Sequence, residues 1–156
     1  MRHRILLAVV PEIAARLREC LGSGYEYCLA PTEEAAEAAL SVQKLNLAIV
    51  SYHFDSLHPY RLIQRIRELP STAHMPILLV RGLQLFYQNH ASPEQIGESY
   101  LLLGATAFFS LYEEEQRVGM EKAAEEFRDL VSLLLSAGIG GCTPRMETAK
   151  MALPRR

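Results

Sequence analysis

Short apolar runs alternate with amphipathic segments along most of this sequence. Most of the runs are continuously apolar, which is typical of strands buried on both faces of a parallel sheet. Their spacing predicts five strands, at 5–10, 25–29, 45–50, 77–80 and 106–111.

A helix signal follows each predicted strand. Pro11 suits the first turn of a helix, and apolar residues then recur at helical spacing until a Gly-Ser-Gly stop. Thr32 is a cap residue before two glutamates, Pro59 suits another first turn, and Ser92 precedes a proline at the N1 position. We expect Gly104 to close the fourth helix and a fifth helix to cover about 116–135.

Five strand-helix units in strict alternation predict a doubly wound parallel sheet with helices on both faces. In such sheets, ligands and partners bind near the carboxyl ends of the strands. We expect one domain over residues 1–135, followed by a flexible tail or linker over 136–156, where glycine, proline and scattered charges replace the helical pattern.

Composition and charge narrow the classes of function. The net charge is −2 and the basic residues form no stripe, so a nucleic-acid partner is not expected. The first apolar run is too short for a signal peptide or a membrane span, which favours a cytoplasmic protein without membrane contact. Three cysteines without CxxC spacing indicate reduced thiols and no zinc site.

Four segments, taken in order, are similar to the receiver domain of two-component response regulators. Segment 4–10 resembles its first strand, 46–51 its third, 75–82 its fourth, and 104–111 the Gly-Ala step into its fifth. The resemblance covers roughly residues 4–135. It implies a flavodoxin-like fold and a signalling role exerted through a protein partner.

The residues that a receiver uses for phosphorylation are all replaced. The resemblance places Val9 and Val10 at the acidic pair, Ser51 at the phosphoacceptor, Arg81 at the strand-four hydroxyl residue and Leu111 at the lysine. Receiver chemistry needs carboxylate oxygens around Mg²⁺, and a serine without an adjacent base is a poor nucleophile. We therefore predict a degenerate receiver that is not an enzyme, binds no cofactor or metal, and acts without phosphorylation.

Other polar residues near the predicted strand ends are candidates for metal binding, phosphorylation or anion binding. His53, Asp55 and His58 could form a transition-metal site, but a solvated polar loop is the favoured interpretation. Asp55 as an off-register phosphoacceptor has no acidic neighbours to hold Mg²⁺. Arg81 could bind an anion, but an ion pair inside the protein, with Asp55 or Glu113, is favoured.

The segment between the fourth strand and fourth helix is longer than in receivers and unusually apolar. Phe86 and Tyr87 in it, with Phe108 on the fifth strand, are the candidate partner-binding residues, although Phe108 is favoured as a core residue. A homodimer through the face of the fourth helix, fifth strand and fifth helix is the related expectation. The alternative function is small-ligand binding or enzyme activity on the same flavodoxin-like scaffold.

Overall fold

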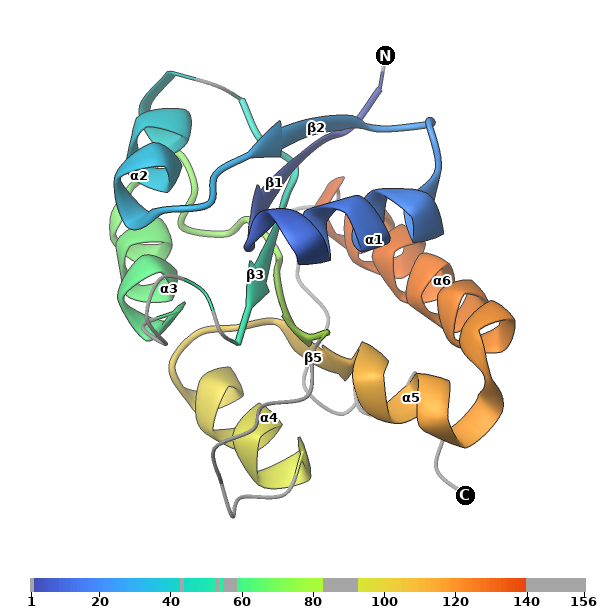
Figure 1. Ribbon diagram of the computed structural model, residues 1–156. Coiled ribbons are helices and arrows are strands. Elements are labelled where there is room, and N and C mark those ends of the chain that lie inside the picture. Colours follow the sequence, from blue (N-terminus) through green and yellow to red (C-terminus); the bar gives the residue numbers. More distant parts are fainter. Residues whose placement is uncertain (1, 43, 53, 55–58, 83–92, 140–156) are drawn as a thin grey trace.

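The computed structural model describes residues 2–42, 44–52, 54, 59–82 and 93–139. Five parallel strands form one sheet in the order β2-β1-β3-β4-β5 (Figure 1). The strands are β1 (Arg4–Ala8), β2 (Glu26–Leu29), β3 (Leu47–Ser51), β4 (Ile77–Arg81) and β5 (Ala107–Ser110). This confirms the predicted doubly wound, flavodoxin-like sheet.

Helices cover both faces of the sheet. They are α1 (Pro11–Leu21), α2 (Glu33–Val42), α3 (Pro59–Glu68), α4 (Pro93–Leu102), α5 (Leu111–Val118) and α6 (Met120–Ile139). Helices α1 and α6 pack side by side on one face, while α2, α3 and α4 lie on the other (Figure 1).

The core divides into two halves because successive side chains of a strand point to opposite faces. On β1, Ile5 and Leu7 join the half beneath α1 and α6, whereas Leu6 and Ala8 join the half beneath α2 and α3. All four are fully buried. The continuous apolar runs of the sequence therefore supply both halves at once, as a doubly covered parallel sheet requires.

Local signals place several helix ends as expected. Helix α1 begins at Pro11, and the Thr32 hydroxyl accepts a hydrogen bond of 3.1 Å from the Ala35 amide at the start of α2. Gly104, just after α4, has φ +120°, a conformation that side chains with a Cβ rarely adopt.

The chain after β5 differs from the sequence expectation. The strand ends at Ser110 instead of continuing to Leu111, and two helices replace the single one expected at about 116–135. Ser110 caps α5, because its hydroxyl accepts from the Glu113 amide at 3.4 Å, and Gly119 at φ +92° separates α5 from α6. Helix α6 continues to Ile139, past the expected start of the tail at residue 136.

Candidate functional site at the carboxyl ends of the strands

The fold brings the expected receiver positions together at one edge of the sheet. In the parallel register, Ala8 pairs with Val50, Ser51 with Val80, and Arg81 with Ser110. The carboxyl ends of β1, β3, β4 and β5 are therefore neighbours. We call this group of five residues the strand-end site: Val9, Val10, Ser51, Arg81 and Leu111.

Apolar side chains at the strand-end site belong to the core. Val9 is 0% exposed and Leu111 is 1% exposed, and both lie in the half of the core that α1 and α6 cover. Val10 is partly buried against the same half. A Cβ at Gly82 would come 2.6 Å from Ile13 Cδ1, so Ile13 fills the space beside the end of β4. The side chains of these residues offer no oxygen atom to a hard cation.

Ser51 is enclosed within the protein. Its exposed fraction is 0%, and its carbonyl oxygen accepts a hydrogen bond of 3.0 Å from the Phe54 amide. The next amide, that of Tyr52, donates to Val80 across the sheet at 2.7 Å. The hydroxyl therefore lies where an incoming phosphodonor cannot reach it unless neighbouring groups move.

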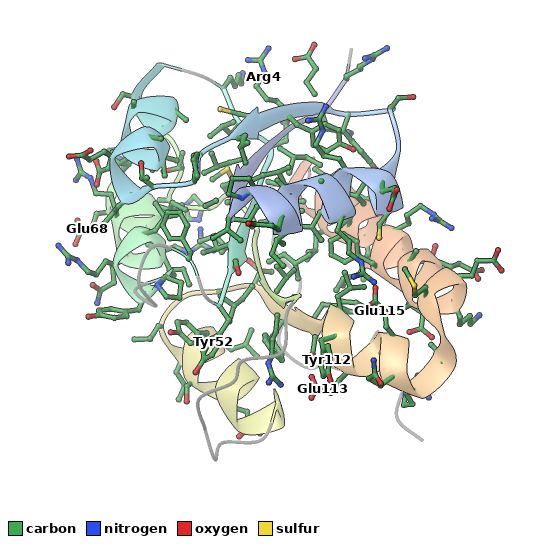
Figure 2. The ribbon with its side chains drawn as sticks, viewed as in Figure 1. Arg4, Tyr52, Glu68, Tyr112, Glu113 and Glu115 are labelled. Atoms are coloured by element: carbon green, nitrogen blue, oxygen red, sulfur yellow. The ribbon has the colours of Figure 1, made fainter. Side chains whose placement is uncertain are left out.

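Arg81 forms an ion pair with Glu113 at the start of α5. Its Nη1 lies 3.0 and 3.1 Å from the two carboxylate oxygens, and the Arg81 side chain is only 17% exposed. The Ser110 hydroxyl also donates to Glu113 at 2.5 Å, and the Arg81 guanidinium lies 5.9 Å from the centre of the Tyr112 ring. Figure 2 labels Tyr112 and Glu113 together at this end of the sheet. The predicted Arg81–Glu113 pair is confirmed, whereas Asp55 lies outside the described residues.

Two glutamates attach α5 to neighbouring elements, and a third pairs within the helix. Glu113 pairs with Arg81 of β4, and Glu115 pairs with Arg16 of α1 (Figure 2). Between them, Glu114 pairs with Arg117 within α5 at 2.7 Å. Sequence reasoning missed the contact between α5 and α1, because residues 99 positions apart give no sequence signal of pairing.

Phe108 lies beneath α4 as a core residue. It is 6% exposed, and a Cβ at Gly97 would come 2.9 Å from its Cδ2 atom, so the helix passes directly over the ring. The core interpretation of Phe108 is thus confirmed. Contact between Phe108 and a partner stays a prediction and would require α4 to move.

Two tyrosines join the end of β3 to α4. The rings of Tyr52 and Tyr100 meet edge to face with centroids 5.9 Å apart, beside α4 in Figure 2. Burial, followed by the nearby Tyr52 and Tyr60 hydroxyls, raises the pKa of Tyr100 to about 12. The phenol therefore stays neutral at physiological pH and acts as part of the packing.

Several candidate residues from the sequence fall outside the described part of the chain. These are the two loop aromatics and the three residues of the candidate metal site: Phe86, Tyr87, His53, Asp55 and His58. Within the described ranges, histidines, cysteines and carboxylates form no group of three or more suited to a metal. Nor does any helix in those ranges combine the length and apolarity needed to cross a membrane.

Comparisons with known proteins identify the fold. No family model and no curated protein matches the sequence. Among solved structures, the phosphorylated cyanobacterial phytochrome response regulator RcpA is similar at TM-score 0.65 and 14% identity, over 88% of this chain and 96% of that one.

Two further solved structures show the same similarity. A response regulator from Hahella chejuensis matches at TM-score 0.60 and 14% identity, over 80% of this chain and 92% of its own. A CheY-like receiver domain from Methanospirillum hungatei matches at TM-score 0.56 and 21% identity, over 81% and 99%. The chain has the fold of response-regulator receiver domains.

Proposed function

We propose that this protein is a signalling module with the receiver fold that binds a protein partner without being phosphorylated and without enzyme activity. One observation carries the proposal. At the strand ends, where receiver chemistry takes place, Val9, Ser51 and Leu111 are buried, and the Arg81 guanidinium is paired with Glu113.

The chemistry of phosphoryl transfer supports this reasoning. The transferred group carries negative charge that Mg²⁺ and a lysine normally offset, and Mg²⁺ binds oxygen ligands. The side chains of Val9 and Val10 provide no carboxylate oxygen, and the Leu111 side chain provides no charge. The remaining cation, Arg81, already contacts both oxygens of the Glu113 carboxylate.

The ion pair also supports a single conformation. It joins the end of β4 to the start of α5, while Glu115 and Arg16 join α5 to α1. A receiver changes partners when phosphorylation moves groups at these positions. Here the same positions are held by contacts that need no phosphoryl group, so we propose that partner binding follows the concentration of the partner alone.

The surface around α4 is the proposed partner face. Leu102 and Leu103 at the end of this helix are 88% and 43% exposed, and solvent-exposed leucines of this kind favour contact with another apolar surface. Phe86 and Tyr87 are proposed to belong to the same face. We propose that it binds a signalling protein, and that the adjoining surface of α4, β5 and α6, the helix that covers most of the expected fifth helix, serves a homodimer.

Chemical phosphorylation tests the proposal directly. The purified protein is incubated with acetyl phosphate and Mg²⁺ beside a receiver that has all of its acidic residues, and intact mass is measured. We expect no adduct on this protein and none on a Ser51→Ala variant, which should keep wild-type binding. A stable phosphoryl adduct at Ser51 or Asp55 would contradict the proposal.

Truncation of the loop aromatics tests the partner face. Aromatic anchors in a desolvated interface typically lose about 2 kcal/mol or more of binding free energy on truncation to alanine. Phe86→Ala and Tyr87→Ala should weaken capture of a partner from the native cell while the melting temperature stays unchanged. Unchanged capture by both stable variants would place the interface elsewhere.

A further inference from the structure

A surface hollow lies at the opposite end of the sheet from the strand-end site. It is formed where α1 ends and β2 begins, at the amino ends of the strands, and its volume is about 590 Å³. We call it the α1/β2 hollow. Its lining consists of Arg2, Ala15, Arg18, Glu19, Gly22, Ser23, Tyr25 and Tyr27.

The two arginines of this hollow differ from the other described arginines. Ten arginines lie in the described ranges, and eight of them contact a carboxylate or a backbone carbonyl. Arg2 and Arg18 make no such contact with any residue in those ranges. Both unpaired guanidinium groups therefore face the same hollow, where Glu19 is the single acidic residue in the lining.

Capping of α1 does not account for Arg18. The carbonyls at the end of this helix accept hydrogen bonds from other donors. The Arg18 carbonyl accepts from the Gly22 amide at 2.8 Å, and the Cys20 carbonyl accepts from the Arg128 side chain at 3.0 Å. The Gly22 carbonyl accepts from the Tyr27 hydroxyl at 2.5 Å. The N–H donors of the Arg18 side chain are thus not used by these three carbonyls.

Aromatic rings orient the Arg18 guanidinium. Its central carbon lies 5.4 Å from the centre of the Tyr27 ring, and Tyr25 meets Tyr27 edge to face with centroids 6.3 Å apart. A guanidinium that stacks on a ring keeps its in-plane N–H groups free to bind phosphate or carboxylate in bidentate fashion. The hollow thus combines two cationic groups with exposed aromatic surface.

From this arrangement we infer that the α1/β2 hollow binds a small organic anion in which phosphate groups are joined to a flat ring. The arginines contact the phosphates, and the ring packs against the tyrosines. The volume lies within the range of roughly 300–1,000 Å³ that is usual for sites of drug-sized ligands. The hollow and the strand-end site lie at opposite ends of the sheet and share no residues, so this inference does not rest on the proposed signalling function.

Calorimetric titration of the full chain with adenosine diphosphate, in the presence of a chelator, tests the inference. Pyrophosphate tests the anion alone and adenosine the ring alone. We expect saturable binding of the diphosphate, at least tenfold tighter than that of either fragment, with shifted ring signals of Tyr25 and Tyr27 in NMR spectra. No saturable binding, or equal affinity for pyrophosphate, would overturn the inference.

Variants locate the binding. Arg2→Gln and Arg18→Gln should each weaken binding of adenosine diphosphate about tenfold or more, with an unchanged melting temperature. Arg61→Gln is the matched control, because Arg61 is 59% exposed and pairs with Glu33 on the other face of the sheet. An equal loss of affinity for adenosine diphosphate in Arg61→Gln would indicate nonspecific electrostatic attraction and refute the site. Tighter binding of a single-stranded oligonucleotide than of adenosine diphosphate would refute it as well.

Discussion

Introducing a carboxylate by Val9→Asp tests whether the strand-end site is part of the core. Val9 is fully buried beneath α1 and α6. The substitution loses about 2 kcal/mol of apolar burial. It also buries a carboxyl group whose hydrogen-bonding needs the apolar surroundings do not meet, which costs roughly 1–3 kcal/mol. The variant should therefore be less stable by about 3–5 kcal/mol, against a typical total of roughly 5–15 kcal/mol.

The loss of stability in Val9→Asp should depend on pH in a definite direction. Burial disfavours the charged carboxylate, so the pKa of the new group is higher in the folded than in the unfolded protein. The unfolded chain then releases its proton first, near its ordinary value of about 4. Stability should accordingly fall further as pH rises from about 4 to the folded-state pKa, and become constant above it.

Urea unfolding followed by circular dichroism, from pH 4 to pH 8, measures this effect. Val10→Asp is the matched control, because position 10 is only partly buried and the introduced carboxylate can reach water. It should lose much less stability than Val9→Asp. Equal midpoints for Val9→Asp and the wild type, or a Mg²⁺-dependent recovery of the variant, would refute the claim that the site is apolar core.

Three further predictions concern contacts around the same end of the sheet. A double-mutant cycle with Arg81→Gln and Glu113→Gln, measured by urea unfolding, should give a coupling free energy of about 0.5–1 kcal/mol, because Glu113 is partly exposed. A coupling of zero would show that the pair does not join β4 to α5. Gly97→Ala should lower stability by about 1–3 kcal/mol through collision with Phe108, and Phe108→Leu should relieve part of that loss; additive effects would argue against the collision. The free energy of unfolding should fall between about pH 10 and pH 12, because the pKa of Tyr100 is about 12 in the folded protein whereas an unfolded tyrosine ionises near 10. In an ultraviolet titration, the Tyr100→Phe variant should lack the phenol that ionises late.

Local sequence patterns were sufficient to predict the sheet and most helix starts. Continuous apolar runs mark strands covered on both faces, and Pro11 and Thr32 act at helix starts through their own backbone geometry and hydrogen bonds. These effects extend over only a few residues, so they can be recognised from the sequence. The resemblance to receivers placed Val9, Ser51 and Leu111 near strand ends, and the fold brings these strand ends together.

The end of β5 shows where local patterns were insufficient. Thr106 to Leu111 is a plausible strand by composition, but the Ser110 hydroxyl accepts from the Glu113 amide. The strand therefore ends one residue earlier than expected, and α5 begins directly at Leu111. Serine favours both turns and helix caps, and the choice depends on the contacts of the following residues. Here Glu113 is also held by Arg81 from a neighbouring strand.

Apart from Arg81, for which the sequence offered Glu113 as a candidate partner, the pairing of charged residues was decided by the tertiary structure. Arg16 of α1 and Glu115 of α5 pair although they are far apart in the sequence, and Arg18 and Arg2 line one hollow because α1 returns the chain to the start of β2. The sequence by itself determined the order of the strands and the fold, because apolar burial is a property of single positions. The pairing of charges is a property of two distant positions, and it becomes defined only when packing fixes the distance between them.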